Sequence, residues 1–552
     1  MISKQLTLRA LLLSVLGSIL ITASSTYVAL RMSALPWPTV FVAILSMALI
    51  KLRGCGNINE INIAQTGMSA GAMVAGGIVF TLPGLWITGI FKPFNPATQT
   101  FREWMLPKFF PVLFVALAGT VAGTAVCYII RKQFIEKENL PFPIAAAATE
   151  TLRAGDSGGK KSIILITAMT GAGIFTLLRD QIKIANRNII PQGFAYRLKS
   201  FPLELTASPM AVGIGYIIGF TPCAWWLAGG IFSHFVLQTW AVKLENFASV
   251  SDAASFTLTT AIGLMVGSGI AILINFSKRL CNLKTQTVKT SNENTGIANT
   301  PNKKIRTIIL ITSAGIVFLF SNLAKIPAIP SALLLLGIAF ASIMSASITG
   351  QTGINPMEIF AILVLLAIRI FTKIEPLHAF FITGITAVTC GFAGDMLNDY
   401  KMGFNLGTDH TAQTVSQFIG ATVGSIVATL AMFAIIANYG GIGNGTGLTA
   451  AQAHTVASMI QGIGSPLIFT IATLLGTIFF LKKIPAMIIG IGMILPLGMS
   501  TAIFIGGIVS LLAKHFSKKT DYNITGQIIS AGLLGGEGFV GTIIAIIQMF
   551  LK

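Results

Sequence analysis

Amide and carboxylate side chains gather in one stretch of the chain that is otherwise apolar. Residues 57–71 read NINEINIAQTGMSAG, and at 100° per residue one helix face carries Asn59, Asn62, Thr66 and Ser69, with Gln65 beside it. Side-chain amides both donate and accept hydrogen bonds, as recognition of a peptide bond or a chelate requires. Hydrogen bonding between helices is the plainer alternative, but so many amides together favour a substrate-lining role. We assign substrate binding to Asn59, Glu60, Asn62, Gln65 and Ser69.

A second polar stretch, residues 391–417, holds two carboxylates four residues apart. In a helix, Asp395 and Asp399 would share a face and repel each other unless a cation such as Lys401 lay between them. A coupled carboxylate is what a proton symporter needs, so we assign proton coupling to both; a solvated loop is the alternative. Gln413 and Gln417 add two amides, which we assign to substrate binding.

Two further carboxylates are candidates for proton coupling. Glu150 lies three residues before Arg153, and the two could instead neutralise each other on one helix face. Glu537 lies in GGEG inside the last apolar run, and its nearest ionisable neighbours in sequence are Asp521 and Lys552. We therefore expect a lone carboxylate there, which is neutral or titrates with cargo, or which only bonds to nearby backbone.

The composition indicates which elements position these residues. Of 552 residues, 54% are hydrophobic and 10% charged, with a mean hydropathy of +0.80, whereas soluble domains carry about 25% charged residues. The apolar runs are unbroken, as transmembrane helices require and β-barrels do not. We expect an all-α polytopic membrane protein of about 16 transmembrane helices (roughly 14–17). The more polar stretches 141–154 and 449–464 are predicted to be re-entrant or broken segments, and some of the long apolar runs could be two hairpinned helices.

The net charge of +19 is interpreted as a membrane signal, not a nucleic-acid one. Lys and Arg concentrate in short breaks between apolar runs and in the stretch 278–304, as cytoplasmic loops do. We expect a transmembrane half at 1–277, a cytoplasmic basic linker at 278–304 and a second transmembrane half at 305–552. The run at 8–31 is long enough to span, so we interpret it as a first helix and not as a signal peptide, with a cytoplasmic N-terminus.

The two halves resemble each other weakly. A Pro-opened run at 35–38 precedes the polar residues 57–60, and a Pro-opened run at 326–330 precedes GINPME at 353–358. Internal duplication is common in secondary transporters, whose binding site lies between the repeats. We therefore add Asn355 and Glu358 to the substrate-binding set. Glycine pairs such as Gly67/Gly71 and Gly420/Gly424 are expected to pack helices tightly; they permit a homodimer without requiring one.

Several chemistries are not indicated. The five cysteines are far apart with no CxxC, so neither a disulfide framework nor a metal site is expected. GDSGG at 155–159 has no preceding histidine for a trypsin-like triad, and the following GGKKS lacks the spacing of a phosphate-binding loop. We expect no catalytic residues, no enzyme activity, no cofactor and no ATP-driven pump. An intramembrane hydrolase and a passive channel are the rivals from other classes.

Six motifs in order along the chain resemble the oligopeptide transporter family, which includes the yellow-stripe-like metal-chelate carriers. They are residues 59–71 with FTLPGL at 80–85, PFP at 141–143 with ETLRAG at 150–155, SP at 208–209 with GIGYIIG at 213–219, GINPM at 353–357, AGDM to Gly403 at 393–403, and LPL at 495–497 with GG at 506–507. The resemblance covers nearly the whole chain, and the length is typical of prokaryotic members. Two places depart from the family pattern: Ile144 follows Pro143, and HTAQ occupies 410–413.

The resemblance implies proton-coupled import of small peptides, or of peptide-like metal complexes, by a duplicated fold of roughly 16 helices. We accordingly expect a secondary active symporter of oligopeptides in the plasma membrane, in contact with lipid and protons. Uptake of metal chelates is the alternative.

Overall fold

The structure is a computed structural model of a mainly helical chain. It describes residues 5–32, 39–51, 56–155, 160–184, 187–188, 190–191, 193–198, 201–243, 247, 249–286, 303–352, 355, 357–443, 446–462, 465–516 and 520–551. The first half contains α1 (Leu8–Met32), α2 (Thr39–Lys51), α3 (Ile58–Val79), α4 (Gly84–Ile87), α5 (Phe101–Arg131), α6 (Pro143–Gly155), α7 (Lys160–Asp180), α8 (Pro209–Ile218), α9 (Phe220–Ile231), α10 (Ala241–Lys243) and α11 (Val250–Gln286). Two π-helical turns, η1 (Lys132–Lys137) and η2 (Phe232–Trp240), continue α5 and α9.

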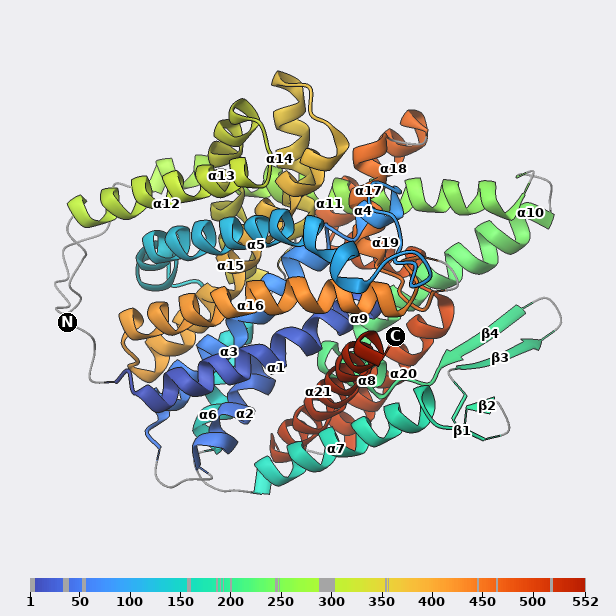
Figure 1. The fold of residues 1–552 in the computed structure, drawn as a ribbon, viewed down its shortest axis with the longest axis horizontal. Coiled ribbons are helices and arrows are strands. Elements are labelled where there is room, and N and C mark those ends of the chain that lie inside the picture. The colour runs from blue at the N-terminus through green and yellow to red at the C-terminus, as the bar shows by residue number, and fades with distance from the viewer. Residues whose placement is uncertain are drawn as a thin grey trace.

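The second half contains α12 (Lys303–Leu323), α13 (Ala328–Thr352), α14 (Met357–Phe371), α15 (Pro376–Leu406), α16 (His410–Asn438), α17 (Ala451–Gln461), α18 (Pro466–Leu481), α19 (Ala486–Ile494), α20 (Leu497–Phe516) and α21 (Thr520–Leu551). The all-α class is confirmed, with one unexpected addition between α7 and α8. There, β1 (Lys183–Ile184) pairs antiparallel with β2 (Arg187–Asn188), and β3 (Gly193–Leu198) with β4 (Phe201–Thr206). These hairpins project at one edge of the molecule (Figure 1).

Eleven helices of the described chain are long and apolar enough to cross a membrane. Several other apolar runs form shorter pieces. The run 484–513 forms α19 and α20, which are separated at Leu495 and Pro496; Leu495 is extended, as a residue before proline usually is. The stretches 141–154 and 449–464 form α6 and α17, of 13 and 11 residues, each shorter than the ~20 residues of a span.

Both ends of the expected linker at 278–304 are helical. Helix α11 continues to Gln286 and α12 begins at Lys303. Lysine and arginine are good helix formers, so the basic residues at these ends extend the helices. Residues 287–302 lie outside the described part of the chain.

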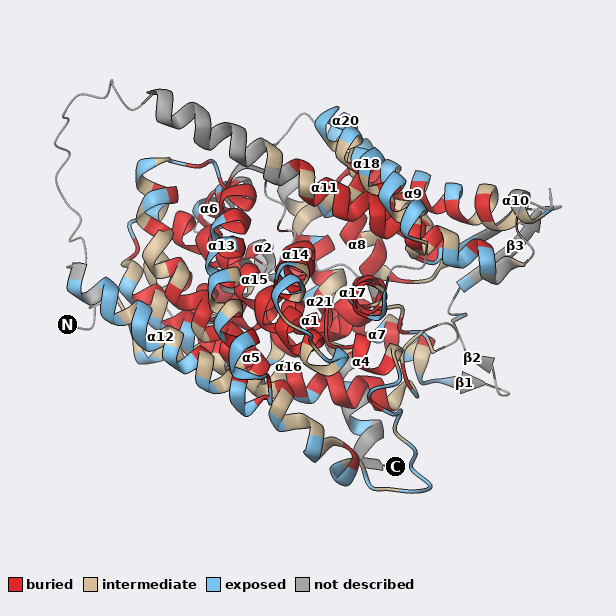
Figure 2. Cartoon of the chain, turned by 90° about the horizontal axis from the view of Figure 1, so that it is seen from above, coloured by how far each residue is buried: buried red, intermediate tan, exposed pale blue. Residues whose placement is uncertain are grey.

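The distribution of apolar and polar side chains is that of a membrane protein. Apolar side chains are exposed along the outer faces of peripheral helices: on α12 Ile308, Ile311 and Leu319, and on α18 Leu467, Ile471 and Leu474. Polar side chains are buried on the central helices α3, α15 and α16. Figure 2 shows the buried residues in the middle and the exposed ones on the outer helices. An apolar rim around a polar interior fits lipid as the surrounding solvent.

Glycines bring the central helices into contact. Helix α16 lies between α5 and α1 (Figure 1), and α3 packs against α1, α15 and α16. A Cβ on Gly420 of α16 would lie 1.9 Å from the carbonyl oxygen of Gly67 on α3, and one on Gly424 would lie 2.4 Å from Cα of Gly71. The prediction that these glycine pairs pack helices tightly is confirmed. A second group of helices surrounds α21, which packs against α7, α8 and α1.

Candidate functional site

Four of the predicted site residues meet around one buried carboxylate. Asp399 on α15 is fully buried and accepts hydrogen bonds from Nε2 of Gln65 (3.0 Å), Oγ of Ser69 (2.7 Å) and Nε2 of Gln417 (3.2 Å). Gln65 and Ser69 are one turn apart on α3, as the helical period predicted, whereas Gln417 belongs to α16. The carboxylate therefore joins both halves of the chain at one point. We call Asp399, Gln65, Ser69 and Gln417 the Asp399 layer.

Gln413 lies beside this layer and forms a hydrogen bond with its main chain. Its Nε2 donates to the main-chain carbonyl of Asp399 at 3.0 Å. A Cβ on Gly403 would lie 2.1 Å from Oε1 of Gln413, so only glycine leaves room for the amide there. Gln413 thus fixes α16 against α15.

The amides nearer the start of α3 form a hydrogen-bonded row. Nδ2 of Asn62 donates to Oγ1 of Thr408, which donates to Oδ1 of Asn59, both at 2.9 Å. Thr408 reaches them because Gly407, with φ +75°, ends α15 in a left-handed turn. Asn59 is half-buried and Asn62 fully buried, so the row leads inward toward the Asp399 layer. Sequence reasoning missed Thr408, and the glycine before it was the available signal.

Asp395 has a separate environment one turn before Asp399. Nδ2 of Asn355, which lies between α13 and α14, donates to Oδ2 of Asp395 at 3.3 Å and to the carbonyls of Cys390 and Gly391 at 3.1 Å. Oδ1 of Asn355 accepts from Ser345 of α13 at 2.7 Å. Asn355 is therefore a bridge between α13 and α15, and its polar atoms are already engaged.

Four other predictions have different outcomes. Glu358 is 2% exposed in the first turn of α14, and Glu60 is half-buried and accepts from Oγ1 of Thr7 at 2.6 Å. The side chain of Glu150, on α6, lies outside the described residues. The expectation that Lys401 separates the two aspartates is wrong: its Nζ donates to Oδ1 of Asn139 at 2.6 Å, because its helix position points it toward that loop.

Glu537 is not the lone carboxylate that we expected. Its Oε1 accepts from Nη1 of Arg179 at 2.8 Å and lies 3.5 Å from Nη1 of Arg31; its Oε2 accepts from Oγ of Ser208 and the backbone N–H of Met210, both at 2.9 Å. The ends of α1 and α7 and the start of α8 bring these groups onto α21. Two guanidiniums and two further donors therefore surround the carboxyl group of Glu537.

The buried polar core has a surplus of acceptors. Among the described residues of α3, α15 and α16, seven buried side-chain oxygens have no hydrogen-bond partner: Oδ1 of Asn62, Oε1 of Gln65, Oδ1 of Asp395, Oδ1 of Asn398, Oε1 of Gln413, Oε1 of Gln417 and Oδ1 of Asn438. Buried polar atoms without partners are uncommon in native proteins. No cluster of three or more His, Cys, Asp or Glu that could hold a metal occurs in the part of the chain that the structure describes.

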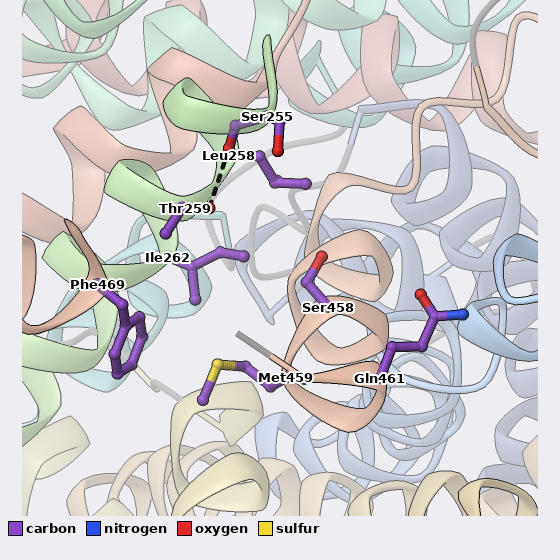
Figure 3. Close-up of a pocket in the computed structure, with 9 residues that line it drawn as sticks. Ser255, Leu258, Thr259, Ile262, Ser458, Met459, Gln461 and Phe469 are labelled. Atoms are coloured by element: carbon purple, nitrogen blue, oxygen red, sulfur yellow. Dashed lines mark hydrogen bonds between the residues drawn. The ribbon is translucent and has the colours of Figure 1, made fainter. Parts of the chain in front are cut away.

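A small cavity of about 130 Å³ lies elsewhere, between α11, α17 and the start of α18 (Figure 3). Its lining is uncharged and consists of Ser255, Leu258, Thr259, Ile262, Ser458, Met459, Gln461, Gly462 and Phe469. Oγ1 of Thr259 already donates to the carbonyl of Ser255 at 3.0 Å. None of these residues was predicted as a site.

Two comparisons with known proteins agree with this architecture. Residues 5–548 match the model of a family described as OPT oligopeptide transporter protein. A protein of Haemophilus influenzae that bears the name "Putative oligopeptide transporter" is 24% identical over 607 aligned positions, which cover 94% of this chain and 92% of that protein.

Proposed function

Since this chain belongs to the OPT oligopeptide transporter family, we propose that it imports small oligopeptides across the plasma membrane together with protons. The observation that carries the proposal is the row of amides that leads inward from the start of α3, where Asn59 and Asn62 of the first half meet Thr408 at the end of α15 in the second. Transporters with duplicated halves bind cargo where the halves meet, and amides match the donors and acceptors of a peptide backbone.

The three described carboxylates that we assigned to proton coupling differ in how well their charge is compensated. Glu537 has two arginines, and Asp399 has three neutral donors. Asp395, 2% exposed, accepts from Asn355 at 3.3 Å, and its Oδ1 is one of the oxygens without a partner. A buried carboxylate with so little compensation favours its protonated form. We therefore assign the coupling proton to Asp395.

The charge distribution supports a cytoplasmic N-terminus. Arg9 donates to the carbonyl of Ile50 at the end of α2, and Arg306 to that of Ile129 near the end of α5. The start of α1 and the end of α5 lie toward the same edge in Figure 1, where α12 and α16 also begin. Lys and Arg are enriched on the cytoplasmic side of membrane proteins, which makes this the inner face.

The test is uptake of a mixed di- to hexapeptide pool by proteoliposomes, with and without an inward proton gradient. We expect gradient-dependent accumulation of intact peptides by the wild type. Asp395→Asn should abolish that accumulation while retaining peptide exchange without a gradient, because exchange needs no net proton movement. Glu375→Gln, which removes an exposed charge at the start of the same helix, is the matched control.

Other results of this assay would contradict the proposal. Accumulation of iron chelates that peptides do not compete for would favour metal-complex transport, which the same amides could serve. Cleaved cargo inside the vesicles would indicate a hydrolase, and equilibration without accumulation a passive channel.

A further inference from the structure

Asp399 is a buried carboxyl group whose hydrogen-bond partners are all neutral. Its carboxylate accepts from two amides and one hydroxyl. No Lys, Arg or His nitrogen of the described chain forms an ion pair with it within 4.0 Å, and the nearest basic residue in sequence, Lys401, is bonded to Asn139. Neutral donors solvate an anion but leave its charge uncompensated in a low-dielectric interior.

The amides around this charge present oxygens that lack donors. Gln65 and Gln417 each donate from Nε2 to the carboxylate. Only the amide group itself therefore separates each Oε1 from Asp399. Both side chains are fully buried, and both Oε1 atoms are without a hydrogen-bond partner. One proton on Asp399 would provide a single donor. A cation would satisfy several oxygens at once and compensate the charge.

The close packing of the helices around the Asp399 layer favours a ligand the size of a single ion. Gly67 lies between Gln65 and Ser69 on α3, and Gly420 lies three residues beyond Gln417 on α16. The two glycines bring the helix backbones together, with 1.9 Å between a Cβ on Gly420 and the Gly67 carbonyl oxygen. Helices this close leave no width for a peptide chain between them, whereas a bare ion needs only a gap between ligands.

We propose that the Asp399 layer binds a small monovalent cation, with Asp399 as the charged ligand and the side-chain oxygens of Gln65 and Gln417 beside it. One carboxylate balances one positive charge, whereas protein sites for divalent ions commonly supply more than one carboxylate. Amide and carboxylate oxygens are suitable ligands for a hard cation stripped of water. The site goes beyond the proposed function, because this cation is neither the cargo nor the proton on Asp395. Its charged ligand lies on α15 and its amide ligands lie on α3 and α16, so binding favours the conformation in which α15 contacts that pair of helices.

The test is thermal unfolding of the purified full-length chain in detergent, without peptide or gradient, at fixed pH and ionic strength. Chloride salts of Li⁺, Na⁺ and K⁺ are compared with choline chloride. We expect one of the small cations to raise the unfolding temperature saturably over choline, since a ligand that binds only the folded state stabilises it. Asp399→Asn should remove this shift, and Gln65→Met or Gln417→Met should raise the half-saturating concentration at least about tenfold. Glu375→Gln should leave the shift unchanged.

Equal unfolding temperatures in all four salts would overturn the proposal, as would a shift that Asp399→Asn retains. A stabilisation that depends on Asp399 but is produced by peptides and by none of the three cations would also overturn it, since the oxygens would then receive the ammonium of the cargo. If Asp399→Asn does not fold, the two Gln→Met variants decide, because they keep the charge and the side-chain length. The readout needs no transport, so its failure and a failure of proton-driven uptake are separate results.

Discussion

Gln65 and Asp399 are 334 residues apart in the chain, yet Nε2 of the amide donates to Oδ1 of the carboxylate over 3.0 Å. This bond joins α3 to α15 and so connects the two halves in the middle of the polar core. On a protein surface such a hydrogen bond adds little net stability, because water can replace it. Inside a membrane no water is present, so a polar group without a partner costs considerable free energy.

Glu537 should be important for stability. Glu537→Gln would remove the carboxylate that pairs with the buried guanidinium of Arg179 across the helices, while Arg179 keeps its ion pair with Asp180. Leaving a buried charge with no partner costs about 3–5 kcal/mol, and the remaining pair makes the cost here smaller. We expect a marked drop in unfolding temperature. Arg31→Gln should cost less than Arg179→Gln, since Arg31 lies 3.5 Å and Arg179 2.8 Å from Oε1. Equal stability of Glu537→Gln and wild type would show that the charge cluster is dispensable.

Gly420→Ala should disrupt the contact between α16 and α3. The new Cβ would lie 1.9 Å from a backbone oxygen, which cannot swing aside as a side chain can. We expect poor yield or a clearly lowered unfolding temperature. Gly315→Ala is the matched control: it lies in helix α12 with no atom within 4 Å of its Cβ, and should be neutral or stabilising by up to about 1 kcal/mol. Equal yields and equal unfolding temperatures of the two variants would contradict a tight contact between Gly420 and Gly67.

Asn355→Ala should loosen the junction of α13, α14 and α15. The change removes hydrogen bonds to the carbonyls of Cys390 and Gly391 and to Asp395, and leaves Ser345 without this acceptor. Each buried group left unsatisfied costs about 1–3 kcal/mol. We expect destabilisation of at least about 2 kcal/mol in reversible unfolding. Ser313→Ala, on the outer helix α12, should change little, because its hydroxyl only bonds its own helix.

The orientation can be tested by labelling single cysteines in a background without the native ones. If the start of α1 is cytoplasmic, the exposed loop before α5 is external and the end of η1 is internal. Thr98→Cys should then react with a membrane-impermeant maleimide in intact cells, and Lys137→Cys only after permeabilisation; both side chains are exposed. The reverse pattern would invert the topology.

The candidate site was partly predictable because a helix repeats every 3.6 residues. That period put Ser69 on the polar face of α3 with Gln65 beside it, and in the structure both side chains donate to Asp399. The partners across the fold were not predictable in this way. Glu537 was expected to be isolated because Arg31 and Arg179 precede it by 506 and 358 residues, and no neighbour search along the chain finds them.

Local geometry explains other differences. Lys401 is two residues from Asp399 and therefore points to a different side of α15, where Asn139 receives it. The hairpin of β3 and β4 was not expected, because each strand has only six residues and is too short to show as a pattern in the sequence.

The contact between Gly67 and Gly420 also determines what can move. If α16 slid along α3 by one residue, a side chain would take the place of Gly420 against the carbonyl oxygen of Gly67, where there is no room for it. The two helices therefore form one rigid unit. Gln65, Ser69 and Gln417 then travel together, and their spacing stays constant throughout a transport cycle. Helices that move against each other during transport must meet at surfaces without such glycine contacts. A crosslink between α3 and α16 would therefore not stop transport.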